Sequence, residues 1–266
     1  MARLEVLTLN RYSFSTGALF PLESEDALQR IKNAGFDNAE LMPQALSDAS
    51  EAATRKFEKT GIRIASIHFP LAMFGMLYTA HRTMRDDGRR FTRDLLTMGR
   101  RMGTAILVVH PHSKAIPGYE ALLEQPIIDN LRYLADTCAD FGVLLAMENS
   151  PKTCATAEQL QAYVDSFGPV HMRPMVDTTE VCEAGGDPVQ FLGAIKPCHL
   201  HLSDFSGTSK HLPAGEGDID WAGVKAQLGD YTGFYTLEPS YRYYLEDIDA
   251  RLRRAHAFIA GLFPDA

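Results

Sequence analysis

Eight short β-strand patterns alternate with amphipathic helix patterns along the chain, and this alternation constrains the fold more than any other feature. Strands are predicted at residues 4–9, 38–42, 63–68, 105–110, 143–149, 171–177, 198–204 and 233–238. Strands that are joined through helices form a parallel sheet, and eight such units favour closure into a barrel. The sequence therefore predicts a single α/β domain over residues 1–266 with the (β/α)8 fold, the TIM barrel.

The helix patterns support this reading of the chain. Helices are predicted at about residues 24–34, 49–60, 91–102, 127–141, 157–167, 188–195, 221–228 and 246–263, and a glycine-containing loop at 205–218. In the third helix, Phe91, Leu95, Met98 and Met102 are spaced as one apolar stripe. A doubly wound open sheet is the alternative, but the glycine-rich dinucleotide turn expected after an early strand of such a sheet is absent from the sequence.

Composition and charge narrow the possible partners. The net charge is −8, and without a large basic run the chain has no electrostatic signature of a nucleic-acid-binding protein. The four cysteines form no CxxC pair, which favours reduced thiols. The N-terminal segment lacks an apolar leader, and no stretch is long enough to span a bilayer. We therefore expect a cytoplasmic protein that does not act on a membrane, either monomeric or homo-oligomeric.

Polar residues that could carry chemistry fall at the ends of six different predicted strands. They are His68, His110, Glu148, Asp177, His201 and Glu238. The carboxyl ends of barrel strands converge on one mouth, so these side chains should meet in one small volume. Any one of them could be a helix cap or a satisfied polar residue. Crowded carboxylates, however, repel one another and are expensive to bury unpaired, and a divalent cation would remove that cost.

The kinds of side chain in this set indicate which ions would fit. Imidazole and carboxylate together suit Mn, Co, Zn or Fe, and a carboxylate-rich set also admits Mg. No thiolate belongs to the set, which argues against a structural zinc site. His199 lies two residues before His201 and faces the same side of the strand. We interpret it as a residue that supports a ligand or fills the barrel interior, in preference to a metal ligand itself. Asp204, in the following loop, is expected to orient His201.

Two further residues are weaker candidates for contact with a substrate. Lys210 lies in the loop after the seventh strand, and loops after the seventh and eighth strands of such barrels often hold phosphate. This loop could equally be a solvated glycine-serine segment. Phe69 follows the third strand and could cover one face of a sugar, or it could be a packing residue.

Several segments together resemble the xylose isomerase-like barrel superfamily, which includes sugar-phosphate isomerases and epimerases, ketose 3-epimerases, inosose dehydratases and endonuclease IV-type (AP endonuclease family 2) enzymes. The segments are NAGFDNAELM, SIHFP, VVHP, AMENS, MVDTTE, HLHLSD, HLPAGEGDIDW and YTLEPS, and they span essentially the whole chain. The resemblance to ketose epimerases implies one metal ion bound by Glu148, Asp177, His201 and Glu238.

The endonuclease branch of the superfamily adds further histidines, which His68, His110 and His211 match. Two departures fall on the third metal site of that branch: Glu180 stands where many members have histidine, and Ser209 where the endonucleases have an acidic residue. The sequence therefore argues against a complete three-zinc cluster. Glu180 and the three histidines remain candidates for a second metal ion or for substrate binding.

The resemblance implies a metal-dependent isomerase or epimerase of a sugar or sugar phosphate. A cation at the carbonyl would stabilise the enediolate that forms when a neighbouring carbon loses its proton. We expect Glu148 and Glu238 to bind the metal and also to serve as the acid/base pair. The alternatives are an endonuclease IV-like phosphodiesterase, a keto-polyol dehydratase, and a barrel that binds a small molecule without turnover.

Overall fold

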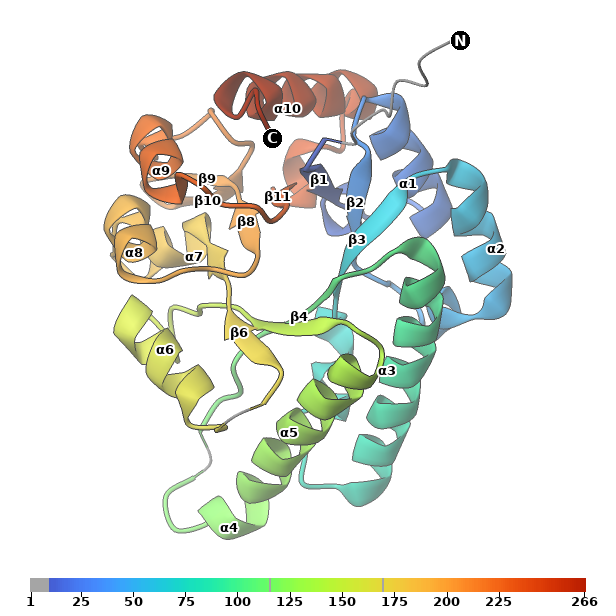
Figure 1. The fold of residues 1–266 in the computed structure, drawn as a ribbon, viewed down its shortest axis with the longest axis vertical. Coiled ribbons are helices and arrows are strands. Elements are labelled where there is room, and N and C mark those ends of the chain that lie inside the picture. The colour runs from blue at the N-terminus through green and yellow to red at the C-terminus, as the bar shows by residue number, and fades with distance from the viewer. Residues whose placement is uncertain (1–9, 115, 169) are drawn as a thin grey trace, which may run out of the picture.

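Parallel strands form the centre of the molecule, and helices surround them (Figure 1). The structure is a computed structural model that describes residues 10–114, 116–168 and 170–266. The strands of the main sheet are β1 (Tyr12–Ser15), β2 (Asn38–Leu41), β3 (Arg63–His68), β4 (Ile106–Val109), β5 (Leu144–Met147), β6 (Met172–Pro174), β7 (Val176–Asp177), β8 (Leu200–Leu202) and β11 (Tyr235–Leu237).

The order of the strands closes the sheet into a barrel. The order is β6-β5-β4-β3-β2-β1-β11-β8-β7, and every neighbouring pair is parallel. β6 and β7 are two parts of one strand interrupted at Met175, so the two ends of the order meet. The prediction of a (β/α)8 barrel is confirmed.

The first strand of the barrel differs from the prediction. The segment 4–9 lies outside the described residues, and the strand between β2 and β11 is β1. In β1, Phe14 packs against Phe36 with ring centroids 5.6 Å apart, whereas the alternate residues Ser13 and Ser15 are buried polar side chains. This alternation of aromatic and serine residues lacks the apolar run that the prediction required.

Eight of the described helices lie close to where the sequence patterns place them, and two short ones, Glu120–Leu123 and Thr178–Glu183, were not predicted. The helices are α1 (Ser24–Asn33), α2 (Glu51–Thr60), α3 (Arg82–Met102), α4 (Glu120–Leu123), α5 (Gln125–Asp140), α6 (Ala157–Asp165), α7 (Thr178–Glu183), α8 (Pro188–Ala194), α9 (Trp221–Leu228) and α10 (Ile248–Leu262). Local signals set several of the ends: Ser50 caps the start of α2, and Gly61, with a φ of 67°, follows its end. Short 3-10 turns occur at Thr16–Leu19, Leu46–Ala49, Leu71–Met76 and Tyr241–Tyr243.

Two apolar clusters hold the barrel together. The larger fills the space between strands and helices and includes Leu107 and Val109 of β4. The smaller contains the alternate residues Ile106 and Val108 of the same strand together with Ala146 and Met175. Because neighbouring residues of a strand face opposite sides, the smaller cluster lies on the interior side of β4.

The first part of the segment after β8, which the sequence predicted as a glycine-containing loop over residues 205–218, forms a hairpin. Strands β9 (Asp204–Ser206) and β10 (Ser209–Leu212) pair antiparallel as a hairpin, and Gly207 at its turn has a φ of 58°. Among the described residues, none of the helices combines the length and apolar character that crossing a membrane requires.

Candidate metal centre

The structure brings four side chains that were predicted as one ligand set to a single point at the strand ends. Nδ1 of His201 lies 2.8 Å from Oε2 of Glu238, 3.3 Å from Oε1 of Glu148 and 3.9 Å from Oδ2 of Asp177. One donor atom from each of the four residues lies within 4.8 Å of the others. We call this set the quartet. Imidazole and carboxylate donors at this spacing could share one divalent ion.

The hydrogen bonding of the Asp177 carboxylate indicates whether the quartet suits an ion. Its Oδ1 accepts a hydrogen bond from the backbone N–H of Glu180 at 2.8 Å and so caps α7. Its Oδ2 is buried and has no hydrogen-bond partner; Nδ1 of His211 lies 4.0 Å away. Leaving a buried carboxylate oxygen unsatisfied is expensive, and a cation in the quartet would satisfy it.

The acidic side chains of the quartet lie close together and mostly out of contact with water, and this shifts the pKa values of Asp177 and His201. Burial raises the pKa of Asp177 to about 8, and the nearby carboxylates of Glu148 and Glu180 add to the rise. Burial alone would lower the pKa of His201, but the carboxylates of Glu238, Glu40 and Glu148 raise it well above its ordinary value. In the absence of an ion, protons on the imidazole and on Asp177 would therefore offset the negative charge.

A second group of candidate ligands shares Glu148 with the quartet. Nε2 of His110 lies 3.1 Å from Oε2 of Glu148, and Nε2 of His68 lies 3.5 Å from the same oxygen. The two Nε2 atoms are 3.2 Å apart. Nδ1 of His68 lies 2.8 Å from the backbone carbonyl of Phe69, and a proton donated there leaves Nε2 with its lone pair. This trio could hold a second ion or bind a substrate hydroxyl.

His211 and Glu180 lie beside the quartet. Nε2 of His211 is 3.5 Å from Oε1 of Glu180. Burial alone would lower the pKa of His211, but the carboxylates of Glu180, Asp177 and Glu238 raise it to about 9. The backbone φ of His211 is 47°, in the left-handed region that few non-glycine residues adopt. The hairpin thus presents His211 to the site at some conformational cost.

The two weaker candidates lie away from the quartet. Nζ of Lys210 forms an ion pair with Glu183 at the end of α7. Phe69 is fully buried and packs edge-on against Phe91, with ring centroids 5.8 Å apart. Among the described residues neither side chain lines the cavity at the mouth of the barrel, and this favours the reading of Phe69 as a packing residue.

The sequence predicted that Asp204 would orient His201, but in the structure its carboxylate has other partners. Its carboxylate accepts hydrogen bonds from the backbone N–H groups of Gly215 at 2.9 Å and Ile219 at 3.1 Å, and from Nε1 of Trp221 at 2.8 Å. Asp204 therefore fastens the segment after β10 to the barrel.

A cavity of about 390 Å³ opens above the quartet. Its lining residues are Gly17, Ala18, Phe20, Met42, Pro43, Gln44, His68, Pro70, Leu71, Ala72, His110, Glu148, Glu180, His211, Glu238, Pro239, Ser240 and Tyr241. The set combines apolar side chains at the rim with acids and imidazoles at the base, as is common in small-molecule sites. No lysine or arginine belongs to it within the described part of the chain.

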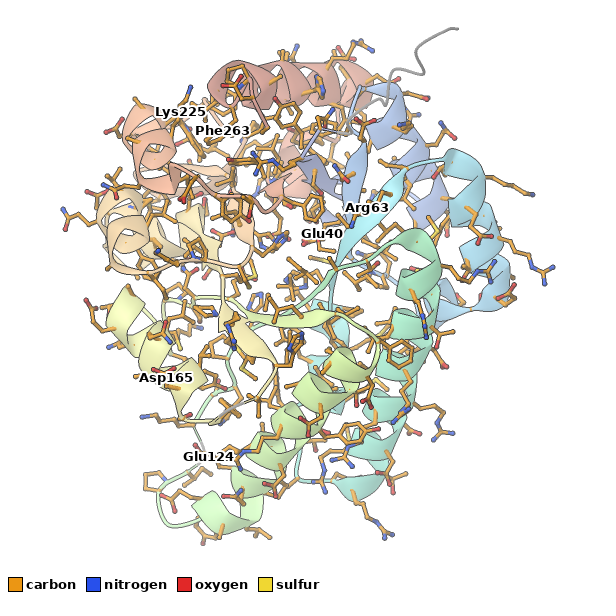
Figure 2. All side chains as sticks on the ribbon, viewed as in Figure 1. Glu40, Arg63, Glu124, Asp165, Lys225 and Phe263 are labelled. Atoms are coloured by element: carbon orange, nitrogen blue, oxygen red, sulfur yellow. The ribbon has the colours of Figure 1, made fainter. Side chains whose placement is uncertain are left out.

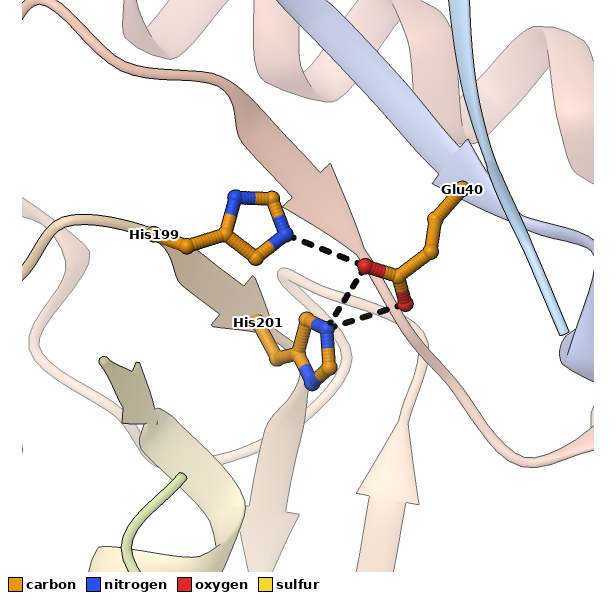
Figure 3. Close-up of side chains that lie close together, drawn as sticks. All are labelled: Glu40, His199 and His201. Carbon is orange, nitrogen blue, oxygen red and sulfur yellow. Dashed lines mark hydrogen bonds and ion pairs between the residues drawn. The ribbon is translucent and has the colours of Figure 1, made fainter. Parts of the chain in front are cut away.

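Glu40 is the site residue that the sequence analysis missed. It lies on β2, fully buried inside the ring of strands (Figure 2), and its carboxylate contacts both His199 and His201 (Figure 3). Burial alone would raise the pKa of Glu40, but the two imidazoles hold it well below its ordinary value. The signal was present: Glu40 is a lone acid between Ala39 and Leu41, near the end of a predicted strand.

The closed order of parallel strands makes the protein a TIM barrel. Its acids and imidazoles gather at the carboxyl ends of the strands, the face where proteins of this class carry their active sites. Within this class, the chain belongs to the xylose isomerase-like TIM barrel family, which matches residues 28–261. No curated protein sequence matches the chain.

Solved structures of sugar epimerases share the fold. A 3-keto-D-glucoside 4-epimerase from E. coli is 18% identical, with a TM-score of 0.74 over 96% of this chain and 100% of that one. A D-psicose 3-epimerase from Clostridium cellulolyticum H10, solved with D-tagatose, is 16% identical, with a TM-score of 0.73 over 95% and 99%. A xylose isomerase domain protein from Alicyclobacillus acidocaldarius is 14% identical, with a TM-score of 0.77 over 96% and 98%.

Proposed function

We propose that the protein is a divalent-metal-dependent isomerase or epimerase of a sugar, and that the quartet holds the ion. The observation that carries this proposal is the convergence of Glu148, Asp177, His201 and Glu238 beneath a cavity of about 390 Å³, with Oδ2 of Asp177 buried and unpartnered. The donor set suits Mn, Co or Zn and also admits Mg. Family membership and the similarity in fold to sugar epimerases support the same class of substrate.

The chemistry needs a proton to leave a carbon next to a carbonyl. A bound cation would supply positive charge at the carbonyl oxygen, which makes that proton more acidic. Glu148 and Glu238 both line the cavity and directly follow two strands, β5 and β11, that are not neighbours in the barrel. One carboxylate would take the proton to give an enediolate, and the other would return a proton to the opposite face of the same carbon. The net result is epimerisation, whereas return to the adjacent carbon gives isomerisation.

The charge of the cavity favours a substrate without a phosphate group. Phosphate is usually held by cationic side chains or by clustered backbone N–H groups. Lys210 is paired with Glu183, and the described lining residues include no lysine or arginine. We therefore place an unphosphorylated sugar ahead of a sugar phosphate as the substrate.

One observation favours a second candidate, an endonuclease IV-like phosphodiesterase. The trio of His68, His110 and Glu148 offers a second ion position that shares a ligand with the quartet. Two neighbouring ions could clamp the oxygens of a phosphodiester. The lack of basic residues around the cavity counts against a polyanionic substrate. Cleavage of an abasic oligonucleotide by the metal-loaded protein would establish this second activity.

The test is proton exchange into a panel of ketoses in D₂O. The Mn²⁺-loaded protein should place deuterium on the carbon beside the carbonyl, and chelation should abolish the exchange. Glu148→Gln and Glu238→Gln should each slow it by about 10²–10⁴-fold, the usual contribution of a positioned acid or base. Glu216→Gln is the matched control, because Glu216 pairs with Arg251 at the surface.

Three results would change the assignment. Elimination of water from the sugar after exchange would identify a dehydratase, which shares the first step. Bound metal without exchange on any sugar would favour the phosphodiesterase. Exchange that survives in both variants would refute the assigned acid/base pair.

A further inference from the structure

The carboxylate of Glu40 lies inside the barrel between His201 of β8 and His199, which directly precedes that strand (Figure 3). Its oxygens are 3.0 Å from Nε2 of His201 and 3.0 Å from Nε2 of His199. Oε2 also accepts a hydrogen bond from Oγ of Ser66 on β3, at 2.8 Å. Glu40, His199, His201 and Ser66 are each fully buried, so this acid is joined to its partners without access to water.

The two nitrogens of His201 therefore face different partners. Nε2 points to Glu40, whereas Nδ1 points to Glu238 and Glu148 in the quartet. An ionised carboxylate is a hydrogen-bond acceptor only, so the nitrogen that faces Glu40 must carry a proton to bond with it. When His201 is neutral its other nitrogen, Nδ1, then holds the lone pair, and this atom is the one aimed at the candidate ion.

We propose that Glu40 is a positioning residue, which fixes His201 as the Nε2–H tautomer and so presents Nδ1 to the metal. This inference rests on the proposed metal centre and adds to it a residue outside the quartet. Carboxylates that accept the second N–H of a ligating histidine orient the ring and increase its basicity. Glu40 meets the geometric requirement for this role through a contact that crosses the barrel from β2 to β8.

A purely structural role for Glu40 would predict something different. Glu40 contacts Ser66 and His199 as well as His201, and neither of those two residues belongs to the quartet. If Glu40 served only to satisfy buried polar groups, loss of any of these contacts should lower stability and leave the ion untouched. If it positions His201, only changes at that contact should weaken metal binding.

Glu40→Gln is the informative variant because it keeps the shape of the side chain and removes the charge. The glutamine amide can turn its NH₂ group toward His201, which favours the opposite tautomer and takes the lone pair away from the ion. We expect Zn²⁺ affinity, measured by competition with a chromophoric chelator, to fall about 10–100-fold, as is usual for a lost outer partner of a ligating histidine. Ser66→Ala, the matched control, removes another contact of Glu40 and should change the affinity by less than about threefold.

A second measurement reports on the tautomer directly. In the ¹⁵N–¹H NMR spectrum of the Zn²⁺-loaded protein, His201 should show a protonated Nε2 and a metal-shifted Nδ1. In Glu40→Gln the resonance of that Nε2 proton should shift or exchange faster with water. Circular dichroism and urea unfolding of each variant confirm that the protein compared is folded.

The outcomes separate this inference from the proposed function. Unchanged Zn²⁺ affinity in folded Glu40→Gln, or binding through Nε2 of His201 in the wild-type protein, would overturn the role of Glu40 and leave the metal centre standing. Absence of Zn²⁺ binding in the wild-type protein would overturn both.

Discussion

The side-chain amide of Asn149 makes two hydrogen bonds to the backbone of Asp177. Its Oδ1 accepts the N–H of Asp177 at 2.7 Å, and its Nδ2 donates to the carbonyl of Asp177 at 3.2 Å. Both residues are buried. This pairing occurs just beyond Met175, where the sixth strand is interrupted between β6 and β7. A side chain from the segment after β5 thus takes over the role of strand pairing and fixes the backbone of a candidate metal ligand.

Replacement of Asn149 by leucine should therefore affect both stability and metal binding. The change leaves a buried N–H and a buried carbonyl of Asp177 without partners, at a cost of about 1–3 kcal/mol each. We expect urea unfolding to show a loss of about 2–4 kcal/mol. Zn²⁺ affinity should also fall, because the carboxylate of Asp177 is no longer held in place.

Asn130→Leu is the control for that experiment. Asn130 is also buried and donates to the carbonyl of Leu77, but it lies outside the quartet and outside the residues that line the cavity above it. It should lose comparable stability and keep its Zn²⁺ affinity. Equal losses of affinity in both variants would mean that Asn149 acts through global stability alone.

Asp204→Asn should loosen the segment that follows the β9–β10 hairpin. Asn cannot accept from all of the donors that converge on Asp204, so part-buried N–H groups such as that of Trp221 lose their acceptor. We expect a loss of about 2–4 kcal/mol in unfolding free energy. Because Trp221 is the single tryptophan, its fluorescence should shift toward longer wavelength, and proteases should cleave residues 205–218 faster.

The control for Asp204 is Asp220→Asn. Asp220 caps α9 by accepting from the N–H of Gly223 at 2.9 Å, and asparagine caps helices about as well as aspartate. This variant should resemble the wild-type protein in both measurements. If Asp204→Asn instead abolished Zn²⁺ binding without loosening the segment, the original expectation that Asp204 orients His201 would be restored.

Stability of the metal-free protein should depend on pH in a defined direction. The pKa of Asp177 is raised from 3.8 to about 8, and that of His211 from 6.5 to about 9. Both groups thus hold a proton more tightly in the folded than in the unfolded chain, so their contribution to stability is lost as pH rises through these values. We expect the Tm in the presence of chelator to fall by several degrees between pH 6.5 and 9, and Asp177→Asn to flatten the slope.

Metal ions should reverse this trend, because an ion competes with the same protons for the same atoms. The rise in Tm on addition of Zn²⁺ should grow across the pH range 6.5 to 9. A Tm of the metal-free protein that increases over this range would contradict the assigned pKa shifts, and a Zn²⁺ effect that does not vary with pH would mean that the ion binds elsewhere.

Much of the fold could be predicted because the barrel strands have local signals. The runs in β3, β4 and β5 are rich in branched apolar residues, and polar residues stand at their ends: His68 closes β3, and His110 and Glu148 directly follow β4 and β5. Helices α2 and α3, which precede and follow β3, are bounded by caps and glycines. β1 lacked such a signal because alternate positions are serines that face the barrel interior. The backbone of Asp177, next to the interruption at Met175, is held by Asn149 from the segment after β5, and local sequence does not reveal this contact. The cap of α7, in which Asp177 accepts the N–H of Glu180 three residues later, is a local signal that the prediction overlooked.

The candidate site, like the fold, could be predicted from the sequence only in part. Positions at strand ends sufficed to predict that Glu148, Asp177, His201 and Glu238 would converge, because barrel topology alone brings those ends together. Glu40 was missed because its role depends on which residues face one another across the barrel interior, from β2 to β8. The pairing of Lys210 with Glu183 likewise depends on how the hairpin folds back on α7.

Anomalous diffraction from a crystal grown with Zn²⁺ would show whether the quartet binds an ion. We expect one strong peak, with one donor atom each from Glu148, Asp177, His201 and Glu238 at about 2.0–2.2 Å from the ion. A further peak between His68 and His110 would support the phosphodiesterase. A Zn²⁺-saturated crystal with no peak inside the quartet would show that these four residues do not form a metal site.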